Sequence, residues 1–229
     1  MTKIRTIPAH EIVRRTYPRP PPSEAEAVSI AVGSAIDGLL AETGYEVRRG
    51  RRPSRAQLTA RAEARLDEAL AEVAVRPSEE ERARVHAQIA STLEAYRHSV
   101  IYGLDRPHTR VILIDGEVGV YAQPDYWDGR ARFFEMKSYL ALPPPPDVAL
   151  QLRLFQLAFP RFEAVLVCLD RHHLPVTSTS AVISPLSQEA AETTLRGAKD
   201  LGRQFGQEKV LEYMEGPFVH YSVPAEGAK

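Results

Sequence analysis

The chain has 229 residues, of which 44% are hydrophobic and 26% are charged, the usage of an ordinary globular domain. Its formal net charge is −1, so no global positive field attracts it to nucleic acid, and any such binding must come from local patches. The single cysteine, Cys168, excludes an intrachain disulfide and a four-cysteine zinc or iron–sulfur site within one chain.

The N-terminal residues 1–15 are polar and charged, and no stretch approaches ~18 consecutive apolar residues. We therefore expect a cytoplasmic protein that does not enter a membrane. The sequence leaves the oligomeric state open.

The first half of the chain is predicted to be helical behind an extended arm. Residues 1–23 are rich in proline and arginine, and proline lacks a backbone donor, which favours an extended conformation. Ser23 is a candidate N-cap for a helix that reaches about Thr43, with apolar residues at helical spacing. After a basic loop, two long helices are predicted over about 54–75 and 78–103, with Ser54 and Ser78 as candidate N-caps.

From Thr109 onward the pattern changes to β-branched and apolar runs. Strands are predicted over 109–114, 118–126, 132–140, 162–169 and 176–183. Helices are predicted over 147–159 and from Ser184 to about Met214. This order indicates a single α/β domain over 24–220 with a central mixed sheet. Its helical layer would occupy 24–107, its sheet core and last helix 108–220, and a short tail 221–229.

The stretch from Gln123 to Lys137 carries the strongest chemical signal. It contains Pro124-Asp125, then nine residues, then Glu135-Met136-Lys137. Side chains alternate along a strand, so Glu135 and Lys137 are expected on one face, with Phe134 and Met136 on the other. A carboxylate and an ammonium so placed between apolar neighbours are an unusual choice for a purely structural strand.

Phosphodiester hydrolysis requires a Lewis acid, a deprotonated water and relief of charge on the leaving oxygen. Asp125 and Glu135 can supply oxygen ligands to Mg²⁺ or Mn²⁺, and the main-chain carbonyl of Met136 can add another. Lys137 can orient the water and stabilise the developing negative charge. In an ideal two-residue hairpin at Asp128-Gly129, however, Asp125 would face away from Glu135. We therefore expect an odd-length loop or a bulge that brings Asp125 opposite Phe133 or Ala131.

These residues resemble the PD-(D/E)XK nucleases, particularly the RecB-like exonuclease branch that includes CRISPR-associated exonucleases. In that branch a later helix carries Gln-x-x-x-Tyr, and this chain has Gln151 followed by Phe155. An upstream helix carries Gly-Thr/Ser-x-x-His, and this chain has Gly33-Ser34 followed by Asp37. The aspartate either preserves the site with a harder ligand set or weakens it. The resemblance implies a restriction-endonuclease-like core, with Asp37 as a third metal ligand and Gln151 orienting Lys137 or the substrate. The iron–sulfur cysteines of some members are absent.

Simpler interpretations fit each feature taken singly. Asp125 can cap a turn, and Glu135 and Lys137 can face solvent from an edge strand. Gln151 can be an exposed helix residue. The basic loop (Arg48, Arg49, Arg51, Arg52 and Arg55) can bind phosphates or be a solvated charge run. Tyr126 and Trp127 can stack on bases or equally pack the hairpin.

Taken jointly, the features predict a divalent-metal-dependent nuclease that hydrolyses DNA, as an exonuclease or on single-stranded or flapped ends, as in DNA repair. The main alternative is a catalytically inactive member of the fold that acts as a nucleic-acid-binding or assembly module, which Asp37 in place of the histidine favours. A third is an unrelated α/β protein of structural role.

Overall fold

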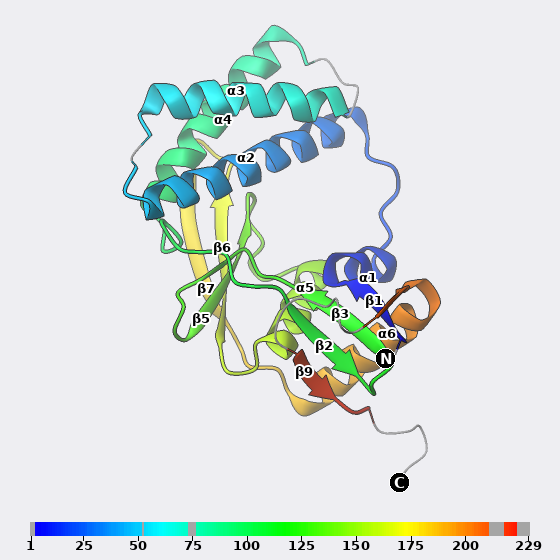
Figure 1. The fold of residues 1–229 in the computed structure, drawn as a ribbon. Helices are drawn as coiled ribbons and strands as arrows, with labels where there is room; N and C mark the ends of the chain where they lie inside the picture. The colour runs from blue at the N-terminus through cyan, green and yellow to red at the C-terminus, as the bar shows by residue number, and fades with distance from the viewer. Residues whose placement is uncertain (1–2, 52, 73–76, 211–217, 224–229) are drawn as a thin grey trace.

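The structure is a computed structural model that describes residues 3–51, 53–72, 77–210 and 218–223. These residues form an α/β fold with two mixed β-sheets. In Figure 1 a layer of three helices lies at the top, a four-stranded sheet lies beneath it, and a five-stranded sheet with three further helices forms the lower part. The C-terminal residues 224–229 and the side chains of Arg55 and Val210 lie outside the described part.

The helical layer consists of α2 (Glu24–Arg48), α3 (Arg55–Glu72) and α4 (Glu79–Arg97). Capping boxes fix the starts of α2 and α4: Ser23 and Ser78 each exchange hydrogen bonds with the glutamate three residues later. α2 continues past Thr43, where the sequence predicts its end, and Gly44 lies inside the helix. Arg52 of the basic loop lies outside the described residues. So do residues 73–75, the end of the predicted helix over 54–75.

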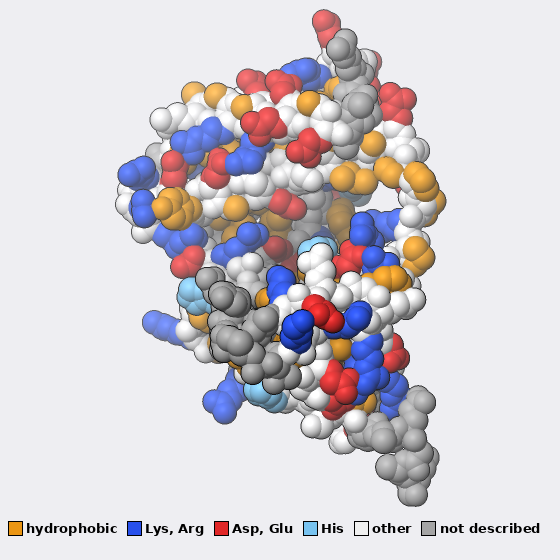
Figure 2. Space-filling model, turned by 45° about the vertical axis from the view of Figure 1, so that its right-hand side comes forward, with side chains coloured by type: hydrophobic (Ala, Val, Ile, Leu, Met, Phe, Trp, Pro, Cys, Tyr) orange, Lys and Arg blue, Asp and Glu red, His pale blue; other side chains and the backbone are white. Residues whose placement is uncertain are grey.

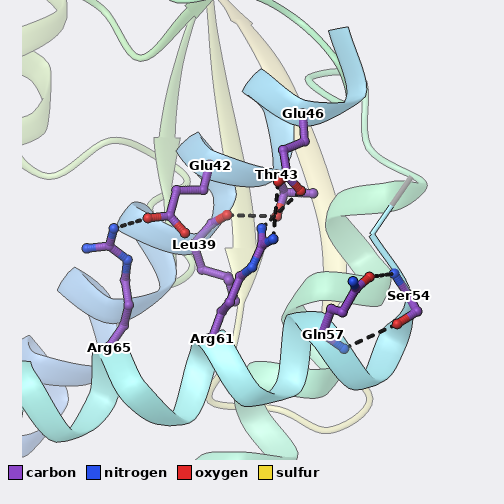
Figure 3. Close-up of polar contacts among 8 residues, drawn as sticks. All are labelled: Leu39, Glu42, Thr43, Glu46, Ser54, Gln57, Arg61 and Arg65. Carbon is purple, nitrogen blue, oxygen red and sulfur yellow. Dashed lines mark hydrogen bonds and ion pairs between the residues drawn. The ribbon is translucent and has the colours of Figure 1, made fainter. Parts of the chain in front are cut away.

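Two arginine–glutamate pairs join α2 to α3 (Figure 3). Arg61 makes a bidentate contact with Glu46, at 2.9 and 3.1 Å, and Arg65 pairs with Glu42. Water screens such partly exposed pairs, so they fix orientation more than they add stability. The larger contribution comes from the apolar face of α2, whose fully buried side chains include Val32, Ile36, Leu39 and Leu40.

By length and composition α2 alone among the described helices would suffice to cross a membrane. Half of that apolar stretch is buried within the fold, as in the core helix of a globular domain.

The strands divide between two sheets, so the expectation of one central sheet is wrong. The five-stranded sheet has the order β8-β1-β3-β2-β9 and contains β1 (Lys3–Pro8), β2 (Arg110–Ile114), β3 (Val118–Ala122), β8 (Gln207–Val210) and β9 (Phe218–Tyr221). The four-stranded sheet has the order β4-β5-β6-β7 and contains β4 (Tyr126–Trp127), β5 (Arg132–Lys137), β6 (Glu163–Asp170) and β7 (Thr177–Ile183). The predicted strand over 118–126 is therefore interrupted. The chain leaves the first sheet after Ala122 and enters the second at Tyr126, and Pro124, which has no N–H for a ladder, lies at the crossing.

Two further expectations fail at the chain's ends. Residues 3–16 are not an extended arm but form β1 and α1 (Ala9–Thr16), because Ile4 and Ile7 are buried where β1 pairs with β3 and β8. The last helix, α6 (Gln188–Phe205), stops at Gly206 rather than near Met214. A Cβ at Gly206 would lie 2.3 Å from the carbonyl oxygen of Gly202, and the chain turns there into β8.

The four-stranded sheet is covered on both faces. One face, which includes Phe134 and Met136, packs against α2, α3 and α4. The other face, which includes Phe133, packs against α5 (Pro146–Ala158). Alternation along β5 therefore places Glu135 and Lys137 on the α5 side, opposite Phe134 and Met136, as expected.

The loop between β4 and β5 sets the register of the two strands. Tyr126 lies opposite Phe134 and Trp127 opposite Phe133. Five residues, 128–132, therefore separate the last paired residues of the two strands, although Arg132 already belongs to β5 through its pairing with β6. The expectation of an odd-length loop is confirmed. If the same register is extended by one residue beyond Tyr126, Asp125 lies at the level of Glu135. We had expected it opposite Phe133 or Ala131.

Asp128 stabilises this loop, because its Oδ1 accepts hydrogen bonds from the backbone N–H groups of Arg130, Ala131 and Arg132 at 2.9, 2.9 and 3.0 Å. Burial opposes the charge of Asp128, but these bonds outweigh it and lower its pKa to about 2.

We expect Asp128→Ala to reduce the free energy of unfolding at pH 7 by about 1–3 kcal/mol, because three backbone donors lose a charged acceptor. The contribution of Asp128 is present above the ordinary aspartate pKa and is lost as pH falls toward 2. Urea unfolding between pH 2 and pH 7 measures both effects. Asp128→Asn, which keeps one acceptor oxygen, should lose less, and equal losses for the two variants would contradict this account.

Candidate functional site

The C-terminal half of β5 places a carboxylate and an ammonium against α5. Lys137 Nζ donates hydrogen bonds to Glu135 Oε1 at 2.7 Å and to Gln151 Oε1 at 3.0 Å. Gln151 projects from α5, on the same side of the sheet as Glu135 and Lys137. Three residues singled out in the sequence are therefore in direct contact.

Asp125 joins this cluster from the crossing between the two sheets. Its Oδ2 accepts a hydrogen bond from the backbone N–H of Met136 at 2.9 Å, which ties it to β5. Its Oδ1 lies 3.9 Å from Nη2 of Arg106, an exposed residue before β2. The negative charge of the Asp125 carboxylate is one of the causes that raise the pKa of Glu135.

Glu135 is the most deeply buried acid of the cluster, with 2% of its surface exposed. Burial and then the neighbouring Asp125 carboxylate raise its pKa to about 8, although Lys137 acts in the opposite direction. Its Oε2 is buried and has no hydrogen-bond partner among the described residues. A shared proton or a cation would satisfy this oxygen.

Lys137 keeps its positive charge in this environment. Burial alone would lower its pKa, but the carboxylates of Glu135 and Asp125 outweigh that effect and raise it. Lys137 is therefore a fixed ammonium beside two acids.

Asp37 approaches the cluster from α2, across a pocket of about 190 Å³. The pocket is lined by Asp37, Ala41, Tyr45, Arg48, Arg106, Asp125, Tyr126 and Met136. Desolvation inside the pocket and the Asp125 carboxylate raise the pKa of Asp37 to about 6, although its side chain keeps an exposed surface at the pocket mouth. Figure 2 shows a recess beneath the helical layer with acidic side chains in it.

As placed, Asp37 does not complete a three-carboxylate centre. Within the described residues no group of three or more histidine, cysteine, aspartate or glutamate side chains is arranged to hold a metal ion. Asp37 and Asp125 line the same pocket, together with Met136, whereas Glu135 is not among its lining residues.

Arg171, which the sequence did not single out, connects α2 to the end of β5. It is 5% exposed, and its guanidinium donates to the carbonyl oxygens of Ser138 at 3.1 Å and Ser29 at 2.7 Å. Its charge also stabilises the ionised form of Asp37. An arginine directly after a strand gives no sequence signal of burial, since most such residues are solvated.

Two of the three described arginine side chains in the basic loop make contacts within the protein. Arg48 donates to the carbonyl oxygen of Leu104 at 2.7 Å and pairs with Asp105 at 3.1 Å, although it also lines the pocket. Arg49 lies over the ring of Tyr45, and Arg51 is exposed. Arg52 and the side chain of Arg55 lie outside the described part of the chain.

The two aromatic residues beside Asp125 pack within the protein. Tyr126 is 7% exposed, and its ring centroid is 6.5 Å from that of Tyr96. Trp127 stacks on Phe162 with ring centroids 6.0 Å apart. The partners of both rings, Tyr96 of α4 and Phe162 before β6, lie outside the hairpin, and base stacking by Tyr126 and Trp127 stays a prediction.

Comparisons with known proteins add little to the site. No family model matches the chain, and no curated protein matches it. Among solved structures, the crystal structure of SSO0001 is similar at 13% identity and a TM-score of 0.35, over 87% of this chain and 84% of that one. A likeness at this TM-score supports no statement about this chain.

The raised pKa of Glu135 predicts how stability depends on pH. Because the folded-state pKa of about 8 exceeds the ordinary value of 4.5, the protein should lose stability by a few kcal/mol as pH rises from 4.5 to 8 in the presence of a chelator. Glu135→Gln stays neutral and should flatten this decline. Guanidinium unfolding at pH 5 and pH 8 measures it, with Glu163→Gln, an exposed position on β6, as the matched control. A decline of equal size in Glu135→Gln would refute the assignment.

Proposed function

We propose that this protein is a divalent-metal-dependent nuclease that hydrolyses phosphodiester bonds in DNA, acting as an exonuclease or on single-stranded or flapped ends. The observation that carries the proposal is the buried Oε2 of Glu135, which has no partner among the described residues and lies beside a second carboxylate and a fixed ammonium. The α/β arrangement is compatible with a restriction-endonuclease-like core, which we propose on the motif rather than on any relative.

The residues fit a hard divalent cation through two carboxylates. Mg²⁺ is commonly bound by one or two carboxylates, with water and substrate phosphate completing its coordination. Asp125 and Glu135 would hold Mg²⁺ or Mn²⁺, together with the main-chain carbonyl of Met136, and Asp37 stays a prediction as a third carboxylate. When bound, the cation would polarise the phosphate and lower the pKa of a water molecule.

The remaining chemistry belongs to Lys137 and Gln151. The ammonium of Lys137 would orient the attacking water and stabilise charge on the phosphate in the transition state. Gln151 would hold Lys137 in position, because its Oε1 accepts one of the three ammonium hydrogens at 3.0 Å. The contact with Glu135 fixes a second hydrogen at 2.7 Å, which leaves the third for water or substrate.

A catalytically inactive nuclease fold that binds nucleic acid or assembles with a partner is the second candidate. The observation that favours it is Asp37, which replaces the family's histidine and does not join the other two acids in a three-ligand group.

Incubation of the purified chain with labelled single-stranded, flapped and duplex DNA in Mg²⁺, in Mn²⁺ and with a chelator tests the proposal. We expect metal-dependent cleavage by the wild type. Lys137→Ala should lower kcat about 100-fold or more, since it removes a preorganised charge from the transition state. Its KM should change much less.

Lys3→Ala, at an exposed lysine of β1, is the matched control and should cleave like the wild type. Absence of cleavage by the wild type in both metals, with unchanged DNA binding by Lys137→Ala, would favour the inactive module.

A further inference from the structure

One face of α2 leads from the acidic pocket to an aromatic ring at its rim. Asp37, Ala41 and Tyr45 follow one another at intervals of four residues, so they lie in line on the helix surface. All three line the pocket that also contains Asp125. With a rise of ~1.5 Å per residue, Tyr45 lies ~12 Å along the helix axis from Asp37.

Tyr45 has the exposure that Tyr126 and Trp127 lack. It is 49% exposed, and the Arg49 guanidinium lies over its ring at 4.5 Å from the centroid. No other ring contact of Tyr45 is found among the described residues. An aromatic ring held by a cation at a pocket rim is a suitable platform for an unpaired base.

Arg106 is the cation best placed to bind a phosphate beside this ring. Its side chain is 58% exposed, it lines the pocket, and its Nη2 lies 3.9 Å from Oδ1 of Asp125. Among the described residues its guanidinium donates no hydrogen bond, and the pair with Asp125 is its one ionic contact. Arg48, by contrast, is already engaged by Leu104 and Asp105.

We propose that Tyr45 and Arg106 form a nucleotide subsite that positions a single strand at the acidic cluster. Tyr45 stacks on a base, and Arg106 binds a backbone phosphate between that base and Asp125. The pocket, at about 190 Å³, is smaller than the ~300–1,000 Å³ of common ligand sites, so it is too small to enclose a base pair. This inference rests on the proposed function for its substrate class.

Binding is measured with Ca²⁺ in place of Mg²⁺, using oligodeoxynucleotides that contain 2-aminopurine and are checked for integrity afterwards. Tyr45→Ala should weaken binding to the single strand about tenfold and abolish the fluorescence change caused by stacking. Tyr45→Phe should retain both properties. Tyr17→Ala removes another exposed tyrosine, 40% exposed, and should behave like the wild type.

The phosphate contact is tested by the salt dependence of the same binding. Arg106→Ala should weaken binding and reduce the slope of log K against log salt by about 0.7, the value for one phosphate contact on a single strand. Arg106→Lys should largely restore the slope. Arg84→Ala, at an exposed position of α4, should leave it unchanged.

The subsite is overturned if Tyr45→Ala binds like Tyr45→Phe, if Arg106→Ala keeps the wild-type slope, or if blunt duplex binds as tightly as the single strand. If the wild type cleaves DNA in Mg²⁺ but Tyr45→Ala and Arg106→Ala bind DNA like the wild type, the subsite alone is rejected. The predicted binding effects without cleavage in Mg²⁺ or Mn²⁺ would support the subsite and reject the nuclease proposal.

Discussion

A carboxylate that is removed from water is stable only when it binds a proton or lies beside a cation. In this fold the carboxylate in that position is Glu135. The strand that carries Glu135 is covered on both faces, by the helical layer and by α5, so its side chain cannot reach solvent. Lys137 satisfies one oxygen, while Asp125 adds a second negative charge beside the other. The described side chains therefore leave the cluster electrostatically incomplete, with one buried carboxylate oxygen that has no partner among them.

The path of the backbone around Pro124 brings the second carboxylate, that of Asp125, to this cluster. A continuous strand from Val118 to Trp127 would keep Asp125 within one sheet, whereas the crossing leaves it free to reach β5. The five-residue loop then brings it level with Glu135, and the Met136 N–H holds it there. A loop one residue shorter or longer would shift the strands by one position and exchange their faces.

The sequence predicted helix starts and strand faces correctly, because both depend on residues that are neighbours in the chain. The capping residues Ser23 and Ser78 marked two helix starts, and the alternation from Phe133 to Lys137 assigned the faces of β5 correctly. The split into two sheets was missed because strand pairing is decided by contacts between distant residues, such as Ile7 with Val120.

Side-chain exposure was equally hard to predict. Tyr45 and Tyr126 are the same residue type, each close to charged neighbours in the sequence, yet only packing against Tyr96 shows which one is buried. Arg171 gave no signal, because its partners Ser29 and Ser138 are brought together only by the tertiary fold. For the site itself, the sequence indicated the grouping of Asp125, Glu135, Lys137 and Gln151, but not the pocket that Asp37 and Asp125 line together.

The helical layer lies between α1 and β2 in the chain, so β1 precedes it and the other strands of the two sheets follow it. It behaves topologically as an insertion: its length and surface can change in evolution without altering strand order. Arg171 limits that freedom at one point, since it ties the start of α2 to the strand that carries Lys137. Related chains could thus differ in most of the helical layer, and with it in the surface offered to a ligand. The first turns of α2 would stay fixed by Arg171 beside the strand that carries Glu135 and Lys137.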